Sequence, residues 1–451
     1  MSALQELFER GRQYLPGGVC ASTRLNQALG HPVYVDHAVG ARVHDVDGKS
    51  WLDMSCGHGA ALLGHGHPAI QQALQRSAQL GICCAHDMPV HIDVAETLCG
   101  LIPCAERIRF TNSGSEATLH ALRLCRAASG RDKIIRFTGH FHGYHELTYI
   151  GGHVPADRLD DASSYVESPG IPDAMAQFIV ALPYNDLNAV DDALTTHAGE
   201  IGTLILEPVD FNSGGILPQP GFLEGLRELT RRHDVLLFFD EIQSSFKKST
   251  GGAQADFGVT PDICTIGKSL GGGMPLSAIC GPAALMDQFK PVGDVQHSGT
   301  FMAPLPSLLS AQAFLEQVSE SGFYPELLTR FDRFYAGLDE IIARRGLPVQ
   351  APRHGARFGL MMGLGEAPVD YRDALKHRPN IMLSFIRHAA AGGVYFHDYG
   401  GGPCHHGFSA AHTDEDIDQT LQVMDDAFAA VADGFAVGGD AGPAKMKRLE
   451  R

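Results

Sequence analysis

Short apolar runs alternate with amphipathic helical segments through the middle of the chain. The apolar runs expected to be strands are residues 107–111, 133–137, 203–207 and 235–240. After Pro220, Phe222, Leu223, Leu226 and Leu229 recur at helical spacing, which predicts a helix between the last two of these strands. This βαβ order predicts a large α/β domain with a mostly parallel sheet over residues 57–320.

The pattern changes on either side of this region. From residue 321, amphipathic helices and shorter strands predict a smaller α+β domain that ends near residue 433. Residues 1–56 begin with an amphipathic helix and are expected to join the smaller domain. Residues 434–451 are rich in glycine and then basic, which predicts a flexible tail.

Composition narrows the class of protein. The chain has 451 residues, of which 44% are hydrophobic, enough for a large core and more than one domain. The formal net charge is −17 and no basic patch stands out, which argues against nucleic acid as a partner. The sequence contains no run of eighteen apolar residues, so no membrane span is predicted. Ten cysteines form no CxxC pair, and Cys83 and Cys84 are adjacent, so reduced thiols and a cytoplasmic location are expected.

Two charged residues stand at predicted strand ends. Lys268 ends the run PDICTIGK and precedes SLGGGMP, although taken alone this string is explained more simply by a strand that ends in an exposed lysine and a glycine turn. Asp240 ends the buried strand 235–240. Ligands of open α/β sheets bind at the carboxyl ends of strands. Pyridoxal phosphate needs such a pair, because a lysine holds its aldehyde as a Schiff base and a carboxylate keeps its ring nitrogen protonated.

Ordered motifs make this reading more specific. From about residue 14 to residue 430 the chain resembles the class III aminotransferases, a fold-type I pyridoxal phosphate family that includes glutamate-1-semialdehyde aminomutase. The blocks are LPGGV, HDVDGKSWLD, GHGHPAI, TNSGSEATLHALRLCRAASGRDKII, GHFHGYHE, LILEPV, LLFFDEIQSSF, GVTPDICTIGKSLGGGMP, SGTF and SAAHTDEDID. The resemblance implies a seven-stranded, mostly parallel sheet flanked by helices, with Lys268 and Asp240 as the catalytic residues.

The resemblance also indicates which residues bind the phosphate of the cofactor. Residues 112–115 lie where a predicted helix starts, and free backbone amides there bind anions, although a serine N-cap alone explains the string as well. By resemblance, Gly114 and Ser115 hold the phosphate with Ser113 close by. Thr300 matches a residue that reaches the phosphate from a neighbouring subunit, which implies a homodimer with shared active sites.

Further site residues follow from the same resemblance. Phe141 and Ile242 are expected on the two faces of the cofactor ring, and Gln243 on its phenolic oxygen. His142 and Glu207 complete the predicted cofactor-binding set. The predicted substrate-binding residues are Arg24, His58, Asn212 and His405.

The resemblance favours intermolecular amino transfer over isomerisation. Aminomutases usually carry an apolar residue where Gln243 stands, and Cys404 aligns with their gating glutamate. We therefore predict an aminotransferase that moves an amino group by a ping-pong mechanism to a 2-oxo acid. The glycines and alanines around His58 suggest that the amino donor has a bulky or aromatic side chain. An aminomutase and a racemase or epimerase on the same cofactor remain alternatives.

A metal-dependent hydrolase is the alternative from a different class. Its ligands would come from two sets of histidines, namely His140, His142 and His145, or His58, His65 and His67. Neither set has an HExxH motif or the spacing of a tetrahedral site, so no metal is predicted.

Overall fold

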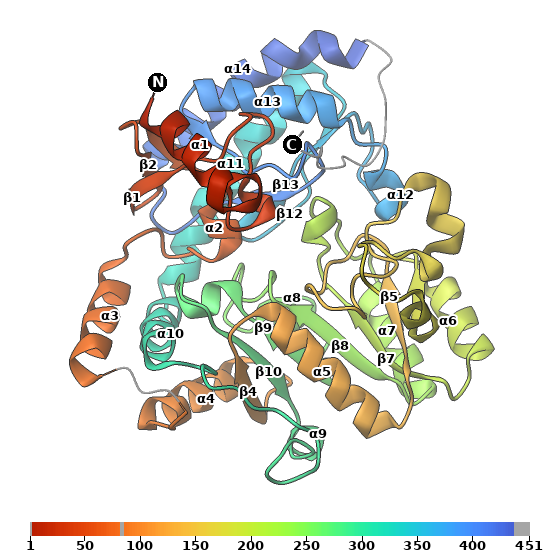
Figure 1. Ribbon diagram of the computed structural model, residues 1–451. Helices are drawn as coiled ribbons and strands as arrows, with labels where there is room; N and C mark the ends of the chain where they lie inside the picture. Colours follow the sequence, from red (N-terminus) through yellow and green to blue (C-terminus); the bar gives the residue numbers. More distant parts are fainter. Residues whose placement is uncertain (1, 82–84, 437–451) are drawn as a thin grey trace.

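A seven-stranded sheet forms the centre of the computed structural model, which describes residues 2–81 and 85–436 (Figure 1). The strand order is β4-β10-β9-β8-β7-β5-β6, and only β10 runs antiparallel to its neighbours. The strands are β4 (Arg107–Thr111), β5 (Lys133–Phe137), β6 (Ile179–Leu182), β7 (Ile201–Leu206), β8 (Leu236–Glu241), β9 (Ile263–Ile266) and β10 (Ser277–Gly281). The predicted seven-stranded, mostly parallel sheet is confirmed.

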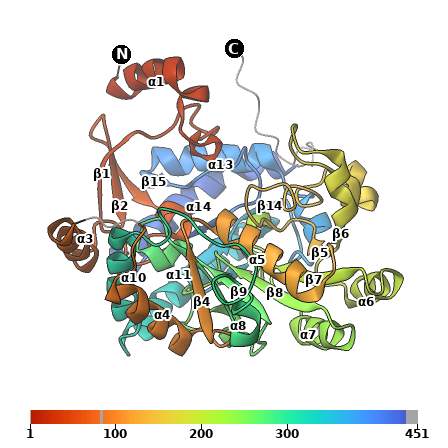
Figure 2. The ribbon, with the colours of Figure 1, turned by 60° about the horizontal axis from the view of Figure 1, so that its bottom comes forward.

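Helices cover both faces of this sheet because strand side chains alternate between them. Phe238 and Ile263 pack on one face with residues of α5, which Figure 2 shows lying along the sheet, while Leu237 and Phe239 point into the larger core on the other face. Helix α7 packs on the second face and confirms the helix predicted after Pro220. The helices are α5 (Gly114–Ser129), α6 (Leu187–Thr196), α7 (Phe222–Arg232), α8 (Gly252–Asp256), α9 (Ala283–Met286) and α10 (Leu305–Val318).

The N-terminal segment pairs with a strand from the far end of the chain. β15 lies parallel to β3, with Val394 opposite Leu52, in the sheet β1-β2-β3-β15. In Figure 1 the red β1 and β2 lie close to the blue C-terminal helices. The elements of this segment are α1 (Ala3–Tyr14), β1 (Val35–Val39), β2 (Arg42–Asp45), β3 (Ser50–Asp53) and the start of α2 (Cys56–Gly59). The next two helices, α3 (Pro68–Leu80) and α4 (Pro89–Leu101), pack against α10.

The C-terminal region packs helices on two small sheets, β11-β14 and β12-β13-β16. Its helices α13 and α14 lie side by side in both ribbon views. The elements are α11 (Phe323–Arg345), β11 (Val349–Gln350), β12 (Arg353–His354), β13 (Arg357–Gly359), β14 (Met361–Met362), α12 (Tyr371–Ala374), α13 (Pro379–Ala391), β15 (Val394–Tyr395), β16 (His405–Gly407) and α14 (Asp414–Ala436). The domain boundaries at residues 56, 320 and 433 stay predictions.

Some predictions fall partly or wholly outside the described residues. The predicted tail begins inside α14, which continues to Ala436, and residues 437–451 lie outside, as do Cys83 and Cys84. The cysteines within the described ranges are all unpaired. Among the described helices, none combines the length and the apolar character needed to cross a bilayer. The cytoplasmic location stays a prediction.

Candidate active site

One edge of the large sheet collects the carboxyl ends of six strands, because β10 is antiparallel to both β4 and β9. A cavity of about 410 Å³ lies at this edge. It brings together eleven of the predicted site residues, which are Ser113, Gly114, Ser115, Phe141, His142, Glu207, Asn212, Asp240, Ile242, Gln243 and Lys268. These residues lie at or beyond the carboxyl ends of β4, β5, β7, β8 and β9, so the parallel order of these strands explains why they meet.

Lys268 lies two residues beyond β9 and lines the cavity. Its backbone has a φ of 44°, in the left-handed region that a non-glycine residue rarely adopts. Burial lowers the pKa of the Lys268 amine to about 8, with the Arg357 cation adding to this effect, while Glu207 and Asp240 oppose it. A larger share of this amine is therefore neutral and nucleophilic near neutral pH than for a solvated lysine.

Asp240 occupies the penultimate position of β8 and is 3% exposed. Its Oδ1 accepts hydrogen bonds from the Thr265 hydroxyl at 3.0 Å and from the Ile242 amide at 3.2 Å. Its Oδ2 lies 2.8 Å from Nδ1 of His142. Each carboxylate oxygen has two acceptor positions, so Oδ2 keeps one for a further donor in the cavity.

His142 is a neutral partner for this carboxylate. Burial lowers the pKa of the His142 ring, although the hydrogen bond to Asp240 opposes this change. Because Oδ2 of Asp240 is an acceptor, Nδ1 of His142 carries the proton. The other ring nitrogen, Nε2, is buried and has no hydrogen-bond partner among the described residues.

The first turn of α5 lines one end of the cavity. Ser113 is the N-cap, and its hydroxyl accepts from the amide of Glu116 at 3.3 Å. The hydroxyl of Ser115 accepts from the amide of Tyr144 at 3.1 Å. The first amides of a helix lack partners within the helix, so those of Gly114 and Ser115 are available to an anion. The Ser113 N-cap therefore leaves this turn able to accept an anion.

The loop that carries Phe141 and His142 is held by two buried ionisable residues, Arg136 and Glu207. The guanidinium of Arg136 donates to the carbonyls of His140, Thr148 and, at 3.1 Å, Ile150. Glu207 accepts from the amide of Phe141 at 2.8 Å. Burial raises the pKa of Glu207, and the nearby Asp210 and Asp240 raise it further.

Two predicted residues, Asn212 and Ile242, occupy the cavity in ways that sequence spacing did not specify. Asn212 donates its amide to both carboxyl oxygens of Glu207 at 2.9 Å. Ile242 is two residues beyond Asp240, but β8 ends at Glu241, so Ile242 lies in the turn that follows the strand. Its side chain still reaches the cavity, where it packs near Gly114.

Four predicted residues lie outside the cavity lining. His405 is behind Gln243, with ring Nδ1 3.0 Å from the Gln243 amide nitrogen. His58 binds the hydroxyl of Tyr399 through Nδ1 at 2.8 Å. The guanidinium of Arg24 donates to the sulfur of Cys20 at 2.8 Å, near the surface. Thr300 is exposed and lines a separate cavity of about 230 Å³.

Two fully buried basic residues beside the site, Lys247 and Arg357, were not among the predicted site residues. Lys247 donates to the carbonyl of Gly59 at 2.8 Å and to the hydroxyl of Ser269, and burial lowers the pKa of its amine strongly. Arg357 donates to the carbonyl of Ser55 at 3.0 Å and to the ring of His405. The string FKK at residues 246–248 resembles an ordinary solvated surface, so hydrophobic patterning alone gave no signal for Lys247.

The histidine sets considered for a hydrolase do not gather into a metal site within residues 2–81 and 85–436. Each ring has a different protein partner. His140 accepts from the amide of Glu207, His145 contacts the Thr118 hydroxyl at 3.2 Å, and His65 contacts Asp53 at 2.8 Å.

A buried lysine and a buried carboxylate on the carboxyl edge of an α/β sheet, next to a helix N-terminus, define an α/β enzyme with a lysine-centred site. Comparison with known proteins gives the family. The chain belongs to the class III aminotransferases, because the family model described as "Aminotransferase class-III" matches residues 25–428. The predicted family, the fold type and the assignment as an enzyme are confirmed, and enzymes of this family act on small amino and keto compounds.

Three relatives show how far the similarity extends. Over 426 residues the chain is 35% identical to a glutamate-1-semialdehyde 2,1-aminomutase of Syntrophomonas wolfei, covering 94% of this chain and 96% of the relative. It is similar to an omega-transaminase from Sphaerobacter thermophilus, with a TM-score of 0.88, 29% identity and coverage of 95% and 97%. A β-phenylalanine aminotransferase from Variovorax paradoxus has a TM-score of 0.84, 27% identity and coverage of 96% and 94%.

Proposed function

We propose that this enzyme is a pyridoxal-phosphate-dependent aminotransferase that moves an amino group from an amino acid or amine to a 2-oxo acid. The observation that carries the proposal is the single cavity shared by Lys268, Asp240 and the first turn of α5. These three groups match the three parts of the cofactor that a protein must hold, which are its aldehyde, its ring nitrogen and its phosphate.

The residues of the cavity fit pyridoxal phosphate. Lys268 would hold the aldehyde, Asp240 has an acceptor position left for the ring N–H, and the amides at Gly114 and Ser115 would receive the phosphate. Oε1 of Gln243 and Nε2 of His142 are buried without partners among the described residues, which supports a polar ligand here. Gln243 would contact the phenolic oxygen.

The cofactor, when bound, supplies an electron sink that acidifies the α-hydrogen of the amino donor. The residues of the chain then handle the proton. The Lys268 amine, with its pKa lowered to about 8 by burial, accepts a proton near neutral pH and gives it back at the neighbouring carbon. Asp240 keeps the ring nitrogen protonated, and His142 keeps Asp240 in place by its 2.8 Å contact.

An aromatic or otherwise bulky donor is part of the proposal. Phe141, Tyr144 and Tyr149 form an aromatic group next to the cavity, with the Phe141 and Tyr144 rings 5.0 Å apart. The similarity to a β-phenylalanine aminotransferase agrees with a donor of this kind. Arg24, His58 and Asn212 are proposed to lie on the substrate side. His405 is proposed to act through Gln243, which it contacts.

A homodimer with shared active sites is also proposed. Thr300, which matches a residue that reaches the phosphate of a neighbouring subunit, is exposed and lies outside the cavity of its own chain. Two large apolar side chains close to it in sequence, Val292 and Phe301, are 74% and 63% exposed. A second subunit that covers this surface would bury them.

An aminomutase is the second candidate, because the relative with 35% identity has that activity. A donor screen with 2-oxoglutarate and pyruvate as acceptors separates the two. We expect an acceptor-dependent keto product from a bulky or aromatic amino donor, with one amino group transferred for each keto product. Isomerisation of glutamate-1-semialdehyde without an acceptor, together with no transfer in the screen, would reject the aminotransferase.

A further inference from the structure

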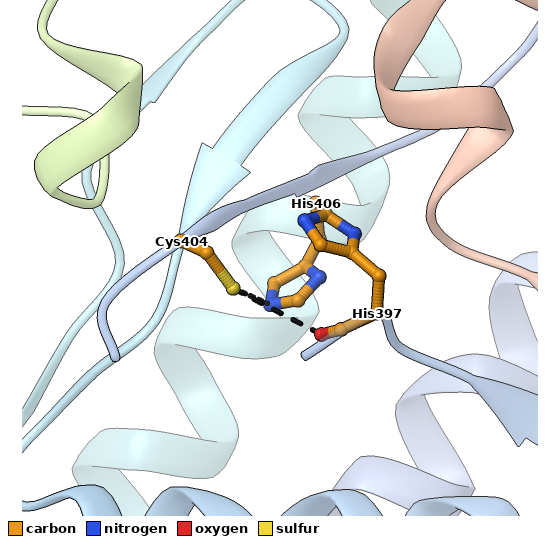
Figure 3. A group of neighbouring side chains, drawn as sticks. All are labelled: His397, Cys404 and His406. Atoms are coloured by element: carbon orange, nitrogen blue, oxygen red, sulfur yellow. Dashed lines mark hydrogen bonds between the residues drawn. The ribbon is translucent and has the colours of Figure 1, made fainter. Parts of the chain in front are cut away.

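Three potential metal ligands meet beside His405, outside the lining of the cavity already described. His397 follows β15, Cys404 immediately precedes β16, and His406 lies within β16. Their ligand atoms all lie within 4.8 Å of one another, and the three residues are 2%, 1% and 0% exposed. Figure 3 shows the sulfur of Cys404 directed toward the ring of His406, with the ring of His397 beside it.

Three ring nitrogens of this cluster are buried without hydrogen-bond partners among the described residues. Neither ring nitrogen of His397 has a partner among the described residues, and Nδ1 of His406 has none either. The contacts of the Cys404 thiol are long, 3.9 Å to the carbonyl of His397 and 3.6 Å to Nε2 of His406. Buried imidazole nitrogens normally have hydrogen-bond partners, so the unpartnered nitrogens of His397 and His406 favour a bound ligand at this cluster.

The separation of the ligand atoms fits a tetrahedral ion. Bonds of about 2.3 Å to sulfur and about 2.0 to 2.1 Å to nitrogen put the two ligand atoms about 3.6 Å apart at a tetrahedral angle. The distance between the sulfur of Cys404 and Nε2 of His406 is 3.6 Å. The remaining distances, at most 4.8 Å, would close by a small rotation of the His397 ring.

From this geometry we propose that His397, Cys404 and His406 bind a zinc ion, with the fourth position open to water or another small ligand. A thiolate and two neutral imidazoles are soft or borderline ligands, which select zinc over magnesium or calcium. The thiolate also offsets part of the metal's charge, which matters because Arg357 contributes a cation near this cluster through its contact with His405.

The ion would fix the segment that carries His405. Since His405 contacts Gln243 at 3.0 Å, a metal that joins residue 397 to residues 404 and 406 would hold one wall of the active-site cavity in place. The site therefore has a positioning role and takes no part in proton transfer.

Cobalt titration of the cofactor-loaded enzyme tests the proposal, with metal content measured separately after zinc loading. We expect one Co²⁺ per chain, the visible absorption of a tetrahedral complex and a near-ultraviolet sulfur-to-cobalt band, all displaced by zinc. Cys404→Ala should lose the sulfur band, and His397→Gln should weaken binding by more than about 100-fold. The matched control is Cys125→Ala, which removes a fully buried thiol from α5 and should leave cobalt binding and the sulfur band unchanged.

The contradicting results are equally specific. The proposal is wrong if no equivalent of metal binds, if bound cobalt shows no sulfur band, or if Cys404→Ala binds cobalt as tightly as Cys125→Ala. X-ray absorption of the zinc-loaded wild-type enzyme gives an answer even where a variant fails to fold. It should require one sulfur near 2.3 Å and two nitrogens near 2.0 Å, and a shell of oxygen and nitrogen only would overturn the site.

Discussion

Replacing Gly143 by alanine is expected to weaken cofactor binding through the phosphate end of the cavity. Gly143 has a φ of +102°, and a Cβ built there would lie 2.7 Å from the Cα of Ser115 and 2.8 Å from its hydroxyl oxygen. The obstacle is backbone at the first turn of α5, so it cannot rotate away. Either the loop or the helix start must move, and both carry proposed cofactor contacts.

The magnitude follows from two contributions. An alanine in the left-handed region costs about 1 to 3 kcal/mol of backbone strain. The overlap with Ser115 adds a packing cost of about 1 to 3 kcal/mol. If Ser115 moves to relieve the overlap, roughly the same 1 to 3 kcal/mol is lost from the free energy of phosphate binding. This loss corresponds to an increase of about 5- to 150-fold in the dissociation constant of pyridoxal phosphate.

Gly170 provides the matched control. Its φ is +96°, almost the same as that of Gly143, but a Cβ there meets nothing within 4 Å. Gly170→Ala should therefore lower the free energy of unfolding through strain alone and leave cofactor affinity unchanged. The assay is titration of each cofactor-free variant with pyridoxal phosphate, followed by absorbance. Equal dissociation constants for the two variants would refute the assignment of Ser115 and its helix turn to the phosphate.

Three further predictions concern other groups. Burial raises the pKa of Glu241 to about 7 from 4.5, so its contribution to stability is complete below about pH 4.5 and is lost as the pH rises through 7. Chemical denaturation at a series of pH values should show the free energy of unfolding of the wild type falling by roughly 3 kcal/mol over this pH range, and no such fall in Glu241→Gln. Parallel pH profiles of the two proteins would contradict the prediction. The rate at which the cofactor-free enzyme recombines with pyridoxal phosphate should rise with pH, with a midpoint near pH 8 set by the Lys268 amine and not at the ordinary lysine value of about 10.4. Stopped-flow absorbance measures this rate, and a midpoint above about pH 10 would contradict the prediction. Asp240→Asn should keep the cofactor but lower kcat/KM by at least about 100-fold, whereas turnover within a few-fold of wild type would remove Asp240 from catalysis.

The placement of Asp240 and Lys268 at one sheet edge was predictable, because parallel strands place such residues by topology. Asp240 and Lys268 follow apolar runs that become β8 and β9, so knowing that both runs are neighbouring parallel strands is enough to bring the two side chains together. The start of α5 was predictable from the local sequence, because the Ser113 N-cap fixes where the helix begins.

Residues that approach the site from distant segments were not predictable in this way. Lys247 and Arg357 are buried by contacts with Gly59 and Ser55, which lie 188 and 302 positions away in sequence. The cluster of His397, Cys404 and His406 depends on how β16 packs beside the end of β15. No local periodicity reports such a placement, because it is decided by tertiary packing.

The most direct test of the account is to locate the covalent bond to the cofactor. The enzyme loaded with pyridoxal phosphate is reduced with borohydride, digested and mapped by mass spectrometry. We predict a single modified peptide, with the reduced cofactor on Lys268, and neither the modification nor amino transfer in Lys268→Ala. A modification on Lys247 or another lysine, with Lys268 unmodified, would contradict the central claim.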